Sequence, residues 1–153
     1  MPSAQKVISR KKDVLDRSIT YASLPKSYAS NSAKESLLLE YVEDFRRQFV
    51  QVFPSRRPLT LCPLNECGVR KFLPSTVRPS LLPYHDVYDL PEAAQFVADY
   101  LTFMPLDEPT RLPDLVPSTM TVLQVRKGDC MDMSIFLVSL LRGAGYNAFV
   151  VTG

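Results

Sequence analysis

Residues 125 to 153 read VRKGDCMDMSIFLVSLLRGAGYNAFVVTG, and this stretch decides the fold class. Asp129 and Asp132 have the spacing of a helix N-cap and of an acidic residue in the first turn, so the pattern predicts a helix that begins at Cys130. Gly143 is expected at the left-handed C-terminal position of that helix. The run YNAFVV that follows is rich in β-prone residues and predicts a strand. A helix followed by a strand indicates an α+β fold.

The position of Cys130 raises the question of catalysis. A cysteine in the first turn of a helix faces unpaired N–H groups and the positive end of the helix dipole, which is typical of nucleophilic thiols. Asp129 and Asp132 flank the thiol, and their negative charge favours its protonated form. A cysteine nucleophile also needs a base, and His85 is the only histidine in the chain. A Cys130–His85 pair remains an alternative to a structural cysteine.

The upstream sequence predicts two further helices. The first spans residues 32 to 50, with Ser32 and Glu35 at capping-box spacing. Its apolar stripe either packs against this chain's own core or docks onto a partner. The stripe consists of Leu38, Tyr41, Val42, Phe45 and Phe49. The second helix spans residues 89 to 104, with Asp89 and Glu92 at capping spacing. Its apolar face consists of Ala93, Phe96, Val97, Tyr100, Leu101 and Met104.

The remaining segments are predicted to be irregular. Thirteen prolines against five glycines favour long extended connectors, above all a proline-rich wrap over residues 54 to 88. The run TMTVLQV, residues 119 to 125, reads as a short β-prone piece. Residues 1 to 31 carry six Lys and Arg against two Asp and are expected to form a basic disordered arm. Such an arm either binds an acidic partner or is simply a solvated terminus.

Composition excludes several classes of function. The chain has 153 residues, enough for one domain with a real core, and a net charge of only +2. It has no apolar run of membrane-spanning length and no secretory signal, and its three cysteines fit free thiols in a reducing compartment. Cys62 and Cys67 lack the spacing and partners of a zinc site. No nucleotide or metalloprotease motif is present, so we expect no metal and no cofactor.

Two stretches resemble known families. RKGDCMDMSIFLVSLLRGAGYNAFVVTG resembles the segment of transglutaminase-like and papain-like folds in which a Gly-Asp-Cys sequence opens the central helix. LCPLNECGVRKFLPSTVRPSLLPYHDVYDLPEAAQFVADYLTFMPLDEP is similar to the dynein regulatory complex subunit 7 family, large axonemal proteins with a degenerate transglutaminase-like domain. Together the two resemblances cover about residues 59 to 153, and the basic leader lies outside them.

The resemblance implies a structural role. It implies a subunit of the axonemal nexin-dynein regulatory complex that scaffolds the link between doublet microtubules and helps regulate dynein-driven motility. Its partners would be other subunits of that complex, with inner-arm dynein and the doublet microtubule contacted indirectly, and with no nucleic acid, membrane or small-molecule substrate. Its location would be the cytoplasm, cytoskeleton and axoneme of cilia or flagella. The alternative is a transglutaminase-like or protease-like enzyme that uses Cys130.

The sequence also divides into four segments, and the resemblance implies a role for Cys130. Composition and periodicity divide the chain into a basic disordered arm (1–31), an amphipathic helix (32–53) and a proline-rich extended wrap (54–88). The resemblance implies that the rest (89–153) is a truncated transglutaminase-like domain, represented by its central helix and first strand. Cys130 would be a vestigial nucleophile, because the family's His-bearing and Asp-bearing strands are expected beyond Gly153. Met131 and Met133 stand where the family pattern suggests Phe.

Overall fold

The computed structural model describes residues 9 to 152. Helices dominate them, and only four residues belong to named strands, so the chain is α-rich with a small β component. The elements are α1 (Arg10–Ser18), η1 (Tyr21–Ser23), α2 (Lys26–Ala29), α3 (Ala33–Val52), η2 (Leu73–Thr76), η3 (His85–Tyr88), α4 (Leu90–Tyr100), β1 (Thr102–Phe103), α5 (Thr119–Val125), β2 (Lys127–Gly128) and α6 (Cys130–Gly143), where η marks a 3-10 helix. None of the helices in the described part is both long and apolar enough to cross a membrane.

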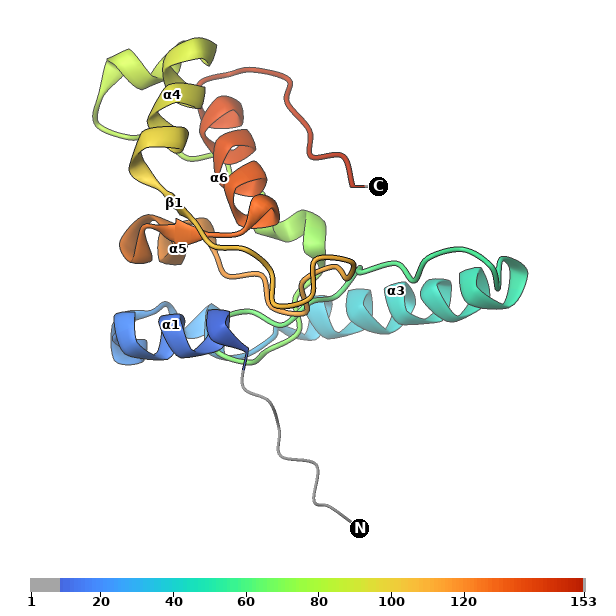
Figure 1. The fold of residues 1–153 in the computed structure, drawn as a ribbon. Coiled ribbons are helices and arrows are strands. Elements are labelled where there is room, and N and C mark those ends of the chain that lie inside the picture. The colour runs from blue at the N-terminus through green and yellow to red at the C-terminus, as the bar shows by residue number, and fades with distance from the viewer. Residues whose placement is uncertain (1–8, 153) are drawn as a thin grey trace.

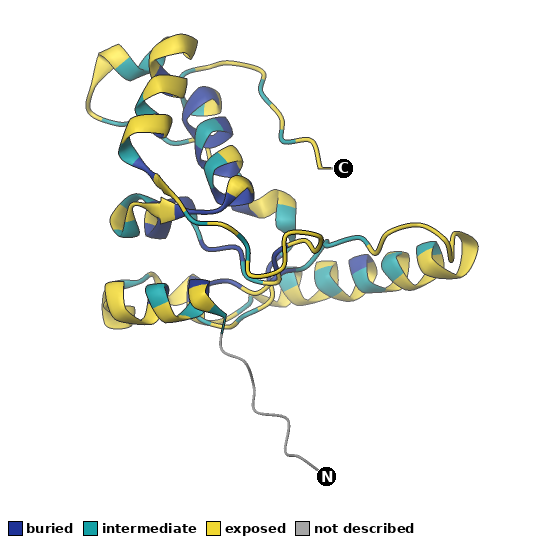
Figure 2. Ribbon diagram, viewed as in Figure 1, coloured by how far each residue is buried: buried dark blue, intermediate teal, exposed yellow. Residues whose placement is uncertain are grey.

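The core lies where α4, α5 and α6 meet (Figure 2). It contains Val97 of α4, Leu101 at the C-cap of α4, Val122 of α5, and Phe136 and Leu140 of α6. Beside it, β1 and β2 form a two-stranded parallel sheet in which Thr102 is opposite Lys127 and Phe103 is opposite Gly128. This sheet connects the end of α4 to the start of α6, and it fixes where α6 begins.

Helix α3 lies apart from this core and extends sideways from the body (Figure 1). The predicted capping box is confirmed, because Ser32 Oγ accepts from the Glu35 N–H and the Glu35 carboxylate accepts from the Ser32 N–H. The helix ends at Val52, two residues beyond the helix predicted over residues 32 to 50 and one residue before the end of the predicted 32–53 segment. The predicted apolar stripe had two alternatives, packing against this chain's own core or docking onto a partner. Leu38, Tyr41 and Phe45 are exposed, so they do not pack against the core.

Helix α4 is shorter than predicted. It begins after Asp89 and ends at Tyr100, because the chain turns into β1 and the Met104 N–H donates to the Gly128 carbonyl. Asp89 occupies the N-cap position, but its side chain makes no capping hydrogen bond. Ala93, Val97 and Leu101 are buried as the apolar pattern predicted, whereas Phe96 is only half-buried.

The expectation of a disordered arm is wrong for residues 9 to 31, and residues 1 to 8 lie outside the described part of the chain. Helices α1 and α2 occupy much of this segment. Leu15, Ile19 and Tyr28 are buried, and so is Lys11. These side chains order the segment because they pack on residues far along the sequence.

Three local expectations near the end of the chain are also wrong. TMTVLQV forms helix α5, because Ser118 caps it by accepting from the Thr121 N–H. Residues 146 to 152 have no regular secondary structure, since no strand in the described residues pairs with them. Gly143 is the last residue of α6, and the left-handed residue is instead Gly145, with φ of 96°. A Cβ on Gly143 would overlap the Ser80 backbone, so close approach is what favours glycine there.

Candidate functional site at the start of α6

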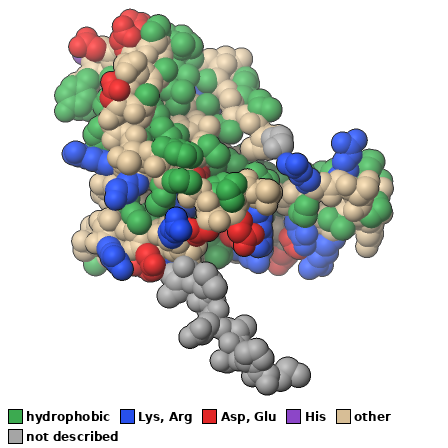
Figure 3. Space-filling model, in the orientation of Figure 1, with side chains coloured by type: hydrophobic (Ala, Val, Ile, Leu, Met, Phe, Trp, Pro, Cys, Tyr) green, Lys and Arg blue, Asp and Glu red, His purple; other side chains and the backbone are tan. Residues whose placement is uncertain are grey.

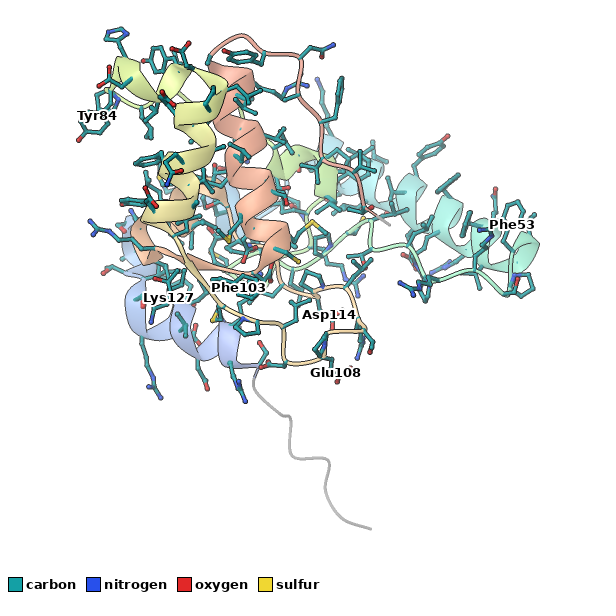
Figure 4. The ribbon with its side chains drawn as sticks, turned by 45° about the horizontal axis from the view of Figure 1, so that its top comes forward. Phe53, Tyr84, Phe103, Glu108, Asp114 and Lys127 are labelled. Atoms are coloured by element: carbon teal, nitrogen blue, oxygen red, sulfur yellow. The ribbon has the colours of Figure 1, made fainter. Side chains whose placement is uncertain are left out.

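Local sequence places Cys130 at the first position of α6, as predicted. Asp129 Oδ1 accepts from the N–H groups of Met131 and Asp132 at 2.9 and 3.0 Å. Asp132 Oδ2 accepts from the Asp129 N–H at 3.1 Å, which completes a reciprocal capping box. Gly128 allows this arrangement, because a Cβ there would lie 2.8 Å from Asp132 Cβ. Figure 4 labels Lys127 and Phe103 of the adjoining strands.

Lys11 of α1 binds both capping carboxylates. Its Nζ lies 2.7 Å from Asp129 Oδ2 and 2.7 Å from Asp132 Oδ2. The side chains of Asp129 and Asp132 are 1% and 0% exposed, and that of Lys11 is 10% exposed. A single ammonium group thus compensates two carboxylates in an interior where an unpaired charge is costly.

Burial has the largest effect on the pKa of Asp132. Loss of solvent raises the pKa of the Asp132 carboxyl to about 6, although the Lys11 ammonium favours the ionised form; the Asp129 carboxylate acts in the same direction as burial. Asp132 therefore takes up its proton near pH 6, where an exposed aspartate would be ionised.

A second buried carboxylate caps α5 in a similar way. The Glu66 side chain accepts from Thr121 Oγ1 at 2.6 Å, from Ser118 Oγ at 2.7 Å and from the Ser118 N–H at 3.2 Å. Lys12 of α1 donates to the Glu66 carbonyl oxygen at 3.3 Å. Two adjacent lysines of α1 therefore reach the two places where α5 and α6 begin.

Cys130 itself is exposed, and its carbonyl oxygen accepts from Ser134 Oγ at 2.7 Å. His85 belongs to η3, beside the N-terminal end of α4 and at the opposite end of α6 from Cys130 (Figure 1). Its ring makes an edge contact with Tyr88, with ring centroids 5.0 Å apart. The structure does not bring the predicted alternative pair, Cys130 and His85, together.

Cys62 and Cys67 are half-buried, and neither lies within a metal-binding group of His, Cys, Asp and Glu side chains among residues 9 to 152. Burial raises the pKa of both thiols, with Glu43 adding to the effect at Cys62 and Glu66 at Cys67. These two cysteines lie in the segment that follows α3.

The arrangement around Cys130 stabilises the fold. Each capping carboxylate is already bound by Lys11 and by backbone N–H groups, so neither is free to orient a catalytic base. Lys11 is the residue that sequence reasoning missed. The spacing of Lys11, Leu15 and Ile19 by four residues could have indicated a packed helix face, although not its partner, and all three are buried in the structure.

The chain is similar to curated proteins over most of its length. It is 51% identical to dynein regulatory complex subunit 7 of Chlamydomonas reinhardtii over 88% of this chain, and 46% identical to the Homo sapiens protein of that name over 93%. It is 45% identical to the coiled-coil domain-containing protein lobo of Drosophila melanogaster over 84%. No family model matches.

The chain spans only a small part of these relatives, namely 12%, 16% and 14% of their respective lengths. A match to the Bos taurus protein named dynein regulatory complex subunit 7, at 44% identity, covers 97% of this chain. The similarity therefore extends into the N-terminal residues, and the expectation that the basic leader lies outside it is wrong.

Proposed function

Over the residues that match, the chain belongs to the dynein regulatory complex subunit 7 family, and from this premise we propose that it is a structural component of the nexin-dynein regulatory complex of motile cilia or flagella. The observation that carries the proposal is the 51% identity to the Chlamydomonas reinhardtii subunit over 88% of this chain. In this role the chain helps to scaffold the link between doublet microtubules and to regulate dynein. Its partners are other subunits of that complex, and its location is the axoneme.

The proposal assigns no catalytic role to Cys130. Lys11 occupies both carboxylates beside the cysteine, and His85 lies at the other end of α6, which supports a vestigial nucleophile position. The proposal includes residues 89 to 153 as the start of a degenerate transglutaminase-like domain, with α6 as its central helix. The preceding segments serve as a connecting region that docks onto this part.

Fractionation of cilia tests the assignment. A tag inserted at the native gene, so that the whole protein is expressed, should place the protein in axonemes after detergent extraction. We expect it to resist a moderate salt wash and to co-purify with the regulatory complex. A protein recovered only in the detergent-soluble fraction, while other subunits stay on the axoneme, would rule the scaffold role out.

A further inference from the structure

Helix α3 carries apolar side chains on two sides, and the described part of the chain covers one of them. On the covered side, Val42 is buried and the Glu35 carboxylate binds Lys71 at 3.2 Å. The segment that follows α3 lies on that side too, because Lys71 belongs to it. The remaining side of α3 faces solvent.

The uncovered side forms a continuous apolar row, which we call the outer stripe. Its members are 40% to 74% exposed: Leu37, Leu38, Tyr41, Phe45 and Val52. Spacings of three, four and seven residues place them along one side of a helix. At its distal end, the rings of Phe45, Phe49 and Phe53 follow one another with centroids 6.4 and 5.2 Å apart. A row of this length differs from the scattered apolar residues of an ordinary surface.

The end of α3 and the segment that follows it are rich in arginine. Between Phe45 and Asn65 the sequence has four arginines, at positions 46, 47, 56 and 57, and no Asp or Glu. Arg46 and Arg47 pair with acidic residues one turn earlier on α3, whereas Arg56 and Arg57 are exposed and make no ion pair with residues 9 to 152. Figure 3 shows hydrophobic and basic side chains together at this end of the molecule.

We propose that the outer stripe is a docking surface for an acidic amphipathic helix of another protein. Apolar side chains of that helix would cover Tyr41, Phe45 and Val52, and its Asp and Glu residues would face the arginines that follow α3. Charge of opposite sign selects the partner and speeds its association, while the buried apolar area supplies most of the affinity. The inference rests on the proposed function only in taking the partner to be a subunit of the same complex.

Two synthetic 21-residue helices test the surface directly. Both carry Leu at the two core positions of each heptad, and they differ only in having Glu or Lys at the flanking positions. Fluorescence anisotropy of the labelled peptides with the full chain should give at least about tenfold tighter binding for the Glu peptide at low salt. That preference should shrink in 0.5 M NaCl, because the charges involved are exposed to solvent.

Matched variants distinguish binding at the outer stripe from nonspecific hydrophobic binding. The double variant Phe45→Ser/Val52→Ser should weaken binding of the Glu peptide by about tenfold or more, because both side chains contribute apolar contact. Arg56→Gln/Arg57→Gln should reduce the preference for the Glu peptide. Leu81→Ser/Tyr84→Ser, at two apolar residues that are 61% and 63% exposed elsewhere, should leave binding unchanged. Circular dichroism should show the same helix content in all variants, since every substituted residue is exposed.

Three results would overturn the inference: equal binding of the Glu and Lys peptides, equal binding by the Phe45→Ser/Val52→Ser variant, or a dimer in sedimentation equilibrium that this variant dissociates. The last result would make a second copy the occupant. A failed peptide experiment together with normal axonemal localisation would reject this inference and leave the proposed function standing. If the peptides bind as expected but the protein is absent from axonemes, the inference about α3 stands and the proposed function is rejected.

Discussion

At the scale of single residues, Lys11 compensates the two carboxylates that cap α6. Replacing it with an uncharged residue leaves Asp129 and Asp132 buried without a counterion, and breaking such a pair costs about 3 to 5 kcal/mol. We expect Lys11→Met to lower the free energy of unfolding by that amount in urea denaturation. Lys12→Met is the matched control, because the exposed Lys12–Asp16 pair is worth about 1 kcal/mol or less. Equal losses in the two variants would contradict the account of the cluster.

The raised pKa of Asp132 predicts a pH dependence of stability. The folded chain holds this proton up to about pH 6, whereas the unfolded chain releases it near the ordinary value of 3.8. Between these values the folded state binds more protons, so raising the pH favours unfolding. A difference of about two pKa units corresponds to roughly 3 kcal/mol, lost between about pH 4 and pH 6.

Chemical denaturation between pH 5 and pH 7 measures this effect. In this range the exposed carboxylates that titrate near pH 4 contribute little. We expect the free energy of unfolding to fall with pH in the wild-type chain and to stay nearly level in Asp132→Asn. A wild-type profile that rises over this range would show that the Lys11 ammonium outweighs burial at Asp132.

The three thiols should react at different rates with a disulfide reagent. Cys130 is exposed at the start of α6, so a reagent reaches its thiol directly. Burial raises the pKa of Cys62 and Cys67, which slows their reaction. We expect Cys130 to be modified first in the folded chain, by mass spectrometry of the peptides, and all three to react alike in urea. Earlier modification of Cys62 or Cys67 would contradict the described packing. Since access alone explains fast labelling of Cys130, the rate is no evidence of catalysis.

At the scale of elements, the buried face of α4 holds the fold together, and Leu101, the residue that caps the C-terminal end of α4, continues this face. Leu101→Ala should cost about 2 to 5 kcal/mol, because Leu101 is 4% exposed and packs in the core with Val122 and Phe136. Leu90→Ala, at a residue of the same helix that is 51% exposed, should cost less than about 1 kcal/mol. Thermal unfolding of both variants measures the difference, and similar melting temperatures would show that α4 does not pack as described.

The elements that sequence predicted correctly are those with local signals. The capping boxes at Ser32 and Asp129 place the starts of α3 and α6, because cap and helix lie within a few residues. TMTVLQV failed because its β-prone composition is overridden by the Ser118 cap, which Glu66 supports from 52 residues away. For the run after Gly145, strand propensity without a neighbouring strand gives no sheet.

The candidate site also has a part that was predictable from local sequence and a part that was not. Its helix start and its cysteine were predictable from residues 129 to 132, whereas Lys11 binds Asp129 from 118 residues away. A lysine-rich segment near a terminus resembles a solvated arm in composition, and only the buried partner distinguishes the two. No pattern within the segment alone reveals a partner at that distance.

At the scale of the whole molecule, the described chain has a helical body and a projecting α3 (Figure 1). The body joins the two ends of the sequence, since α1 packs beside α5 and binds the start of α6. The long segment between α3 and α4 contains only 3-10 helices, and its Ser80 N–H donates to the α6 residue Ser139 at 3.0 Å. This arrangement leaves the outer stripe of α3 exposed while the body is packed by itself, as the proposed scaffold role would require.

The central claim is that Cys130 has no chemical role in this molecule, and the beat of reactivated axonemes from cells carrying Cys130→Ala tests it most directly. The exposed cysteine should be replaceable without loss of stability, so the variant should assemble at the wild-type level and give the wild-type beat frequency and waveform. Normal assembly combined with an impaired beat would contradict the account and show that the thiol itself is needed.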